Sequence, residues 1–369
     1  MKVYLKDNVY EAALKRIERL FDEFDNIVVS FSGGKDSTVV LELALEVARK
    51  KNRLPLKVFF IDQEAEWQHT IDYVKYVMYR PEVDPLWLQC PIKLFNAASH
   101  ETDFLNCWDE GCKDKWMHPQ DPISIKENTF GTDRFHKMFA AAMAKIFNGE
   151  PYANLGGVRT EESPMRFGGV TGALCYKDIT WGKREPKGYT FYPIYDWTFD
   201  DVWIYIAKKK IKYNGIYDLM FNYGIPRTNM RVSNLHHETA YRTLFFLQEV
   251  ERDTYNKLCE RLPGISTFSQ MQGEAVFIKE LPEMFASWKE YRDYLLENIV
   301  RPDLKEEFRK RWKGQDGDDF YREHCVELMV NDWEGTKNGN FVSRRNLVRK
   351  INNGVYEKKY DYKEGEFEE

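Results

Sequence analysis

The sequence predicts an α/β protein built on a parallel sheet with helices on both faces, followed by a mainly helical C-terminal region. Short, continuously apolar runs at 27–29, 58–61 and 86–88 are typical of strands buried on both sides. Segments with apolar residues at helical spacing separate these runs. A Gly-Gly turn joins the first run to the helix that follows. This alternation of strand and helix is the pattern of a sheet covered on both faces.

The predicted helices of the first half are defined by their apolar stripes. A first helix is expected over 9–24, before the first strand. The next two helices each place four apolar residues on one face: Leu41, Ala44, Leu45 and Ala48 in one, and Trp67, Ile71, Val74 and Met78 in the other.

The second half gives a coarser prediction. Residues 99–150 are polar and irregular, which indicates an insertion, and 191–193 resemble a late strand. Thr198 and Asp201 have the spacing of a helix start with a capping box. Helical spacing dominates afterwards, with one stripe formed by Met284, Trp288, Tyr291 and Leu295. We therefore expect an α/β domain over 1–200, a helical region over 201–355 and a charged mobile tail over 356–369.

Composition limits the classes of function. Hydrophobic residues make up 43% of the 369 residues, charged residues 31%, and the net charge is −5. This balance is typical of a globular chain and argues against one that coats nucleic acid through its overall charge. We find neither a run of about 20 apolar residues, as a membrane helix needs, nor a signal peptide. We expect no membrane partner, a cytoplasmic location and six reduced cysteines.

Residues 30–38 form the strongest candidate site. They read Ser-Phe-Ser-Gly-Gly-Lys-Asp-Ser-Thr, between the first strand and its helix. Gly33 and Gly34 allow a sharp turn, and the peptide N–H groups of the helix start favour an anion. The string is shorter than a Walker A loop. The predicted phosphate-binding residues are Ser30, Phe31, Ser32, Gly33, Gly34, Lys35, Asp36, Ser37 and Thr38.

Other residues follow later apolar runs and are expected at the same crevice, beyond the carboxyl ends of the strands. Asp62 is interpreted either as a ligand of a ribose hydroxyl or metal, or as a helix cap. Gly156 and Gly157 form a second glycine turn, and Arg159 and Arg166 follow it. Two arginines at this position suit phosphate or sulfate binding, because a guanidinium donates two parallel hydrogen bonds.

These segments resemble the PP-loop ATP pyrophosphatases, and most closely the phosphoadenosine phosphosulfate (PAPS) reductase-like family. The resemblance rests on the 30–37 string, on 58–62 with Glu66 and Trp67, on 157–166 and on 193–205. It spans about residues 25–225. It implies a Rossmann-like fold of the adenine nucleotide alpha hydrolase type. For the members that use ATP, it also implies cleavage between the α- and β-phosphates with transfer of AMP to an acceptor.

The resemblance assigns roles to four residues. Lys35 and Mg²⁺ would stabilise the leaving pyrophosphate, and Arg159 and Arg166 would neutralise charge at the α-phosphate or on the incoming group. Asp36 would cap the helix or hold Mg²⁺. ATP and Mg²⁺ are thus the expected cofactors, and the acceptor is not named by the sequence.

The chain departs from the reductases in its cysteines, since the Glu-Cys-Gly-x-His context of their C-terminal nucleophile is absent. Three other interpretations stay open. One is a PAPS reductase-type oxidoreductase that uses Cys259 or Cys325. Another is a nucleotide-binding regulator whose basic runs at 208–210 and 309–311 contact a protein partner or, less favoured, DNA. The third is a sulfur transferase that would also start by adenylylation and would act on nucleic acid through Cys107 or Cys112.

Overall fold

The computed structural model of the chain describes residues 6–96, 102, 104–232, 235, 241–266, 280–329 and 331–332. The chain divides into two compact units. The first comprises residues 1–96 and 104–270, and the second comprises 97–103 and 271–369.

A six-stranded sheet forms the centre of the first unit, in the order β3-β2-β1-β6-β8-β7. All neighbours are parallel except β7, which runs antiparallel to β8. The strands are β1 (Asn26–Ser30), β2 (Leu56–Ile61), β3 (Val83–Leu88), β6 (Tyr152–Leu155), β7 (Gly182–Arg184) and β8 (Tyr189–Phe191). A separate antiparallel pair joins β4 (Ile92–Phe95) and β5 (Phe104–Cys107). The predicted parallel sheet is confirmed, and its order reverses between β1 and β6, where open α/β sheets bind ligands.

The helices of this unit connect and cover the strands. They are α1 (Val9–Glu23), α2 (Lys35–Lys50), α3 (Gln68–Met78), α4 (Phe135–Ile146), α5 (Pro164–Thr171), α6 (Phe199–Lys209), α7 (Ile216–Asn222), α8 (Tyr241–Val250) and α9 (Arg252–Arg261). The described residues of this unit also form three short 3₁₀ turns, which are η1 (Glu110–Lys115), η2 (Thr160–Glu162) and η3 (Arg227–Asn229).

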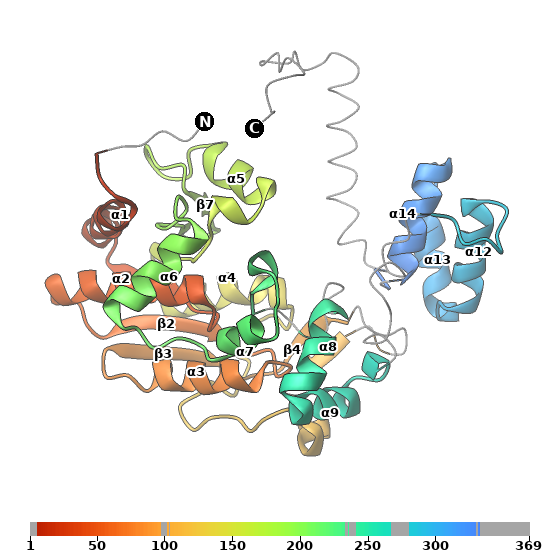
Figure 1. Cartoon of the computed structure of the whole chain (residues 1–369), viewed down its shortest axis with the longest axis horizontal. Helices are drawn as coiled ribbons and strands as arrows, with labels where there is room; N and C mark the ends of the chain where they lie inside the picture. The colour runs from red at the N-terminus through yellow and green to blue at the C-terminus, as the bar shows by residue number, and fades with distance from the viewer. Residues whose placement is uncertain are drawn as a thin grey trace, which may run out of the picture. The chain divides into compact units, whose positions relative to one another are not determined.

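Alternate residues of each strand face opposite sides of the sheet. Val58 and Phe60 of β2 belong to the main core, whereas Phe59 between them contacts the ring of Phe139 in α4. That core also holds residues of α1, α2, α3 and α6, and Figure 1 shows α1, α2 and α6 side by side. Helices therefore cover both faces, as predicted.

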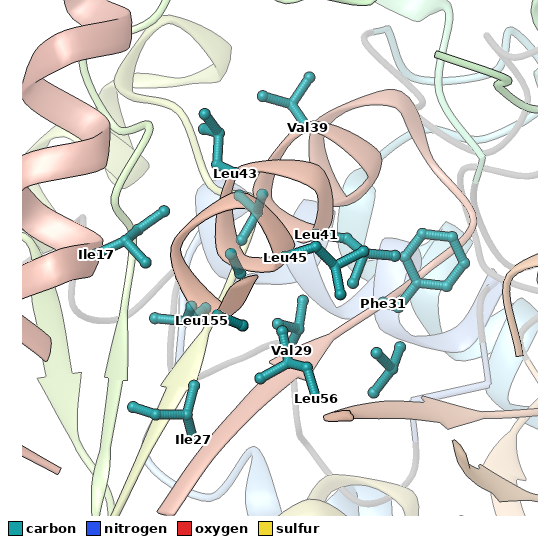
Figure 2. Packing of buried hydrophobic residues seen from close by; sticks show 14 of the residues in the cluster. Ile17, Ile27, Val29, Phe31, Val39, Leu41, Leu43, Leu45, Leu56 and Leu155 are labelled. Carbon is teal, nitrogen blue, oxygen red and sulfur yellow. The ribbon is translucent and has the colours of Figure 1, made fainter. Parts of the chain in front are cut away.

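The main core lies between α2 and the sheet. Leu41 and Leu45 of α2 approach Val29 of β1 and Leu155 of β6, and Ile17 of α1 closes one side (Figure 2). Burying a leucine-sized side chain contributes about 1.5–3 kcal/mol, so this contact fixes α2 firmly on the strands. The start of α2, where the candidate phosphate loop lies, is positioned by the same packing.

Most of the predicted helices are confirmed. Each residue of the two expected stripes in the first half is buried, and Thr198 and Asp201 form the capping box of α6. The predicted stripe from Met284 is wrong at its first member. The helix begins only at Trp288, because Ser287 caps it, and Met284 is 82% exposed.

The compact units do not divide at residue 200. The helix α6 follows that position but contributes Val202, Tyr205 and Ile206 to the core beside the sheet. The division lies near residue 270. Within the expected insertion over 99–150, α4 covers one face of the sheet, so that part belongs to the α/β core. The expected tail over 356–369 lies outside the described residues.

The second unit has its own small core. Its described helices are α12 (Trp288–Asn298), α13 (Pro302–Arg311) and α14 (Asp318–Met329). They bury a cluster that includes Leu295, Phe308, Cys325 and Leu328. The helical character predicted here is confirmed. Across the described residues of both units, no helix combines the length and apolarity needed to cross a membrane.

Candidate functional site

A cavity of 520 Å³ opens where β1, β2 and β6 end, and we call it the first cavity. Its walls come from the loop after β1, the start of α2, the glycine turn after β6, and helix α4. Ten of the residues predicted from sequence line it: Ser30, Phe31, Ser32, Gly34, Lys35, Asp36, Ser37, Gly156, Gly157 and Arg166. The structure therefore brings the two glycine turns together, although they are far apart in the chain.

Gly33 shapes the loop without lining the cavity. Its φ is +69°, a backbone conformation that favours glycine, and an added Cβ would lie 2.9 Å from Cγ2 of Thr70. The turn ends at Gly34, the N-cap of α2, which has no side chain to cap the helix. The peptide N–H groups of the first helical turn have no acceptor within the helix, so this end of α2 favours an anion.

The hydroxyl groups of the loop are used mainly to hold its shape. The Ser37 hydroxyl donates to the carbonyl of Gly34 at 2.9 Å and accepts from the peptide N–H of Ser32 at 3.2 Å. Thr38 also donates to Gly34, at 2.9 Å, and lies outside the cavity wall. The Ser30 hydroxyl donates to Asn154 Oδ1 at 2.9 Å. The expectation that Ser30, Ser37 and Thr38 donate directly to phosphate therefore does not match this geometry.

Lys35, Asp36 and Arg159 form a charged network at the start of α2. Lys35 Nζ lies 3.0 Å from Asp36 Oδ2, and Arg159 Nε donates to Asp36 Oδ1 at 2.6 Å. All three side chains are largely buried. Burial lowers the pKa of Lys35, while the neighbouring Asp36 carboxylate opposes this shift. Asp36 is thus a bridge between two cations and does not cap the helix.

The two predicted arginines face different spaces. Arg166 lines the first cavity, and burial together with the nearby Arg231 lowers its pKa. Arg159 instead lines a neighbouring space of 340 Å³, which we call the second cavity. Lys35, Glu162 and Arg231 line both cavities, so the two spaces adjoin at these side chains.

Asp62 lies away from both cavities and is fully buried. Its carboxylate accepts hydrogen bonds from Trp87 Nε1 at 3.0 Å and Gln89 Nε2 at 2.9 Å. It also accepts from the peptide N–H of Glu64 at 3.0 Å. Because the Asp62 carboxylate accepts all these hydrogen bonds inside the protein, it is not placed to contact a nucleotide. Asp62 also does not cap α3, because the N-cap of that helix is Trp67.

The site does not present a preformed cage for Mg²⁺. Both oxygens of Asp36 pair with cations, which oppose a divalent ion there. Among the described residues, no three His, Cys, Asp or Glu side chains cluster in a metal-binding arrangement. Asp36 therefore does not fit the role of a Mg²⁺ ligand that the sequence suggested. Mg²⁺ is commonly held by substrate phosphates and water, with few protein ligands.

A comparison with protein families gives one clear match. Residues 26–224 match the model of the phosphoadenosine phosphosulfate reductase domain. The chain belongs to this family. The match covers the whole sheet, both glycine turns and the four residues to which the sequence assigned catalytic roles.

Curated relatives of this PAPS reductase family member fall into two kinds. The uncharacterized protein YbdN of Escherichia coli (strain K12) is 28% identical over 313 residues, covering 81% of this chain and 77% of that protein. Sulfate adenylyltransferase subunit 2 of Mycolicibacterium vanbaalenii is 25% identical over 216 residues, covering 56% of this chain and 62% of that protein. The first similarity extends beyond the family domain.

The chain is also similar to two solved structures. The FMN adenylyltransferase of Candida glabrata has a TM-score of 0.36 at 15% identity, covering 59% of this chain and 64% of that one. The PAPS reductase of Candida auris has a TM-score of 0.33 at 18% identity, covering 59% and 94%.

Several residues of the candidate site were not identified from the sequence. The Tyr217 hydroxyl accepts the peptide N–H of Lys35 at 3.1 Å, and Phe135 and Phe139 of α4 form an apolar wall. Asn154 and Thr190 line the wall formed by the strands. A polar Asn154 inside the short buried strand β6 was the one signal that sequence reasoning could have used.

Burial disfavours the thiolate form of three of the four thiols that the alternatives need. Burial raises the pKa of Cys325 to about 12 and raises that of Cys259 as well. Burial also raises the pKa of Cys107 well above its ordinary value. A nucleophilic thiolate requires a lowered pKa.

The basic runs at 208–210 and 309–311, which motivated the regulator alternative, are partly neutralised. Lys209 pairs with Glu46, Arg309 pairs with Glu297, and Arg311 pairs with Glu327.

Proposed function

We propose that this protein binds ATP in the first cavity and cleaves it between the α- and β-phosphates, transferring AMP to an acceptor. The observation that carries the proposal is the meeting of three features in one cavity: Gly34 at the end of the glycine turn, the start of α2 and the Arg166 side chain. Together they supply peptide donors, a helix dipole and a cation for a polyphosphate. The similarity to sulfate adenylyltransferase subunit 2 supports adenylyl transfer as the reaction class.

The cavity suits a nucleotide in size and in chemistry. Its volume of 520 Å³ is within the usual range of small-molecule sites, about 300–1,000 Å³. The phosphate loop forms one wall, while Phe135 and Phe139 offer an apolar surface for a base. A charged triphosphate and a flat aromatic base can thus both find complementary surfaces.

The proposed reaction forms one bond and breaks one. An acceptor oxygen anion attacks the α-phosphorus, and the bond from this phosphorus to the bridging oxygen breaks. Pyrophosphate leaves with the electron pair of that bond. Peptide N–H groups at the start of α2 and the Lys35 ammonium would stabilise the charge on the leaving group.

Arg159 and Arg166 have distinct roles in this proposal. Arg166 would contact the phosphates directly, because its side chain lines the first cavity. Arg159 would hold Asp36, and through it Lys35, since its Nε donates to Asp36 at 2.6 Å. Mg²⁺ would arrive on the triphosphate and neutralise part of its charge.

Product analysis tests the reaction class. The protein is incubated with ATP and Mg²⁺, with and without a small-molecule extract of cells, and the nucleotides are separated by chromatography. We expect AMP and pyrophosphate, more with the extract. ADP and orthophosphate as the main products would contradict cleavage between the α- and β-phosphates.

Two variants test whether ATP binds at this site. Gly34→Val adds a side chain where a single Cβ would already lie 3.3 Å from Ser32 Oγ and from the Tyr217 hydroxyl oxygen. Ser37→Ala removes the hydroxyl that joins Ser32 to Gly34. We expect both to weaken ATP binding about tenfold or more. ATP affinity equal to that of the parent in both would mean that ATP binds elsewhere.

A further inference from the structure

A row of polar side chains crosses the strands along the wall of the first cavity. Ser30 Oγ donates to Asn154 Oδ1 at 2.9 Å, and Asn154 Nδ2 donates to Thr190 Oγ1 at 3.1 Å. Thr190 Oγ1 then donates to Glu185 Oε1 at 3.0 Å. All four residues line the cavity. We call this row the polar relay.

The strand register produces the relay. Asn154 of β6 pairs with Thr190 of β8, and Asn154 also pairs with Val28 of β1, two residues before Ser30. Residues two apart on a strand share a face. The hairpin between β7 and β8 returns Glu185 to the same face, where its peptide N–H donates to the carbonyl of Gly188 at 2.9 Å.

The direction of every hydrogen bond in the relay follows from its last member. Glu185 forms an ion pair with Lys183 at 2.8 Å, and a carboxylate can only accept hydrogen bonds. The single proton of Thr190 must therefore point to Glu185. The amide of Asn154 must then turn its NH₂ group to Thr190 and its oxygen to Ser30.

This leaves Ser30 with its one proton directed at Asn154. Toward the cavity it offers only oxygen lone pairs. A lone pair repels a phosphate oxygen but accepts a hydrogen bond from an N–H or O–H group. Ser30 is half-buried here, and a nucleotide in the cavity would cover it; an acceptor covered without a donor costs about 1–3 kcal/mol, or roughly five- to 150-fold in affinity.

We propose that Glu185, acting through Thr190 and Asn154, fixes Ser30 as a hydrogen-bond acceptor, so that the first cavity selects a nucleotide presenting a donor group there. The donor is either the exocyclic amino group of the base or a ribose hydroxyl. Glu185, Thr190 and Asn154 are positioning residues, and Ser30 contacts the ligand. This inference rests on the proposed nucleotide binding and adds a determinant of its specificity.

Binding measurements with four nucleotides test the relay. ATP is compared with inosine triphosphate, which carries a carbonyl in place of the amino group, and with 2′-deoxy-ATP and 3′-deoxy-ATP, which each lack one hydroxyl. We expect the parent to bind ATP at least about tenfold more tightly than one of these three analogues. The analogue that loses affinity identifies the donor.

Three variants test whether the direction of the hydrogen bonds in the relay, rather than the charge of Lys183 or the shape of Thr190, sets the preference for ATP. In Glu185→Gln the new amide can donate to Thr190, which lets the whole relay reverse. In Thr190→Val the relay is cut while the side-chain shape is kept. We expect both to reduce the preference for ATP to about twofold or less. Lys183→Gln keeps the acceptor at Glu185 and should keep the full preference.

The outcomes distinguish this inference from the proposal on which it rests. A loss of preference in Glu185→Gln and Thr190→Val, with the preference kept in Lys183→Gln, supports the relay. ATP binding with an unchanged preference in the first two variants overturns the relay and leaves the proposed function standing. Equal binding of all four nucleotides by the parent also overturns it. A parent that binds no ATP overturns both.

Discussion

Gly157 packs directly against the peptide group that follows Asp36. A Cβ added at Gly157 would lie 2.8 Å from the carbonyl carbon of Asp36 and 2.8 Å from the peptide nitrogen of Ser37. Neither atom belongs to a flexible side chain, so a larger residue cannot be accommodated without moving the start of α2. The two glycine turns of the site are thus locked together by a backbone contact.

The first prediction follows from this contact. Gly157→Ala should displace the turn or the helix start, weaken ATP binding by about tenfold or more and destabilise the fold by about 1–3 kcal/mol. Gly168→Ala is the matched control, because a Cβ there meets nothing within 4 Å. Calorimetry of ATP binding and thermal unfolding measure both effects. A Gly157→Ala variant that behaves like the control would show that the backbone contact is unimportant.

A second prediction separates the two arginines. Arg159→Met removes one of the two cations that pair with the buried Asp36, so it should cost about 1–3 kcal/mol of stability as well as turnover. Arg166 is 42% exposed and pairs with Glu162. Arg166→Met should therefore weaken ATP binding with a stability change of about 0.5 kcal/mol or less. Denaturant unfolding and turnover assays on both variants check this, and equal destabilisation by the two changes would refute it.

A third prediction concerns pH. His69 Nδ1 forms an ion pair with Glu251, which also accepts the peptide N–H groups of Gln68 at 2.8 Å and His69 at 3.1 Å. The hydrogen bond to Glu251 raises the pKa of His69 above its ordinary 6.5. Burial alone would raise the pKa of Glu251, but the hydrogen bonds from His69 and Gln68 bring this pKa below 4.5.

The sign of the effect follows from these two shifts. The contribution of His69 is complete below pH 6.5 and is lost as the pH rises through its raised pKa. The contribution of Glu251 is present above pH 4.5 and is lost as the pH falls through its lowered pKa. Melting temperatures of the parent and of His69→Gln should differ most between pH 4.5 and 6.5 and converge above this window. A difference that is constant with pH would contradict the ion pair.

The fourth prediction tests the thiol alternatives. Cys259→Ser and Cys325→Ala should leave ATP turnover within about twofold of the parent, because burial keeps both thiols protonated. Cys325→Ala removes a buried sulfur and should lower the melting temperature. Loss of turnover in Cys259→Ser, with an unchanged melting temperature, would instead favour a thiol-dependent reaction.

Sequence patterns predicted the parts of this fold that depend on local spacing. Apolar runs located β1, β2 and β3, and stripes located α2 and α3, because burial on a strand or helix imposes a period on the chain. The glycine turn of the candidate phosphate loop was located for a related reason. A turn between a buried strand and a helix needs glycine where φ is positive, as at Gly33.

The start of α12 shows where local spacing failed. Met284 continues an apolar stripe in the sequence, but the Ser287 side chain accepts the peptide N–H of Glu290 and begins the helix after it. A capping hydrogen bond of this kind outweighs one exposed apolar residue.

What the sequence by itself determined is a parallel α/β core with a glycine turn at the end of β1, the candidate anion-binding site, and a second glycine turn after β6. Only the tertiary structure decided which side chains share a cavity. It buried the Asp62 carboxylate fully inside the protein. It placed Arg159 and Arg166 at different cavities. It also brought Asn154, Thr190 and Glu185 to the wall of the cavity that Ser30 lines. The physical reason is that side-chain direction depends on strand register and on the charges that meet after folding. Neither is encoded in the spacing of any one segment.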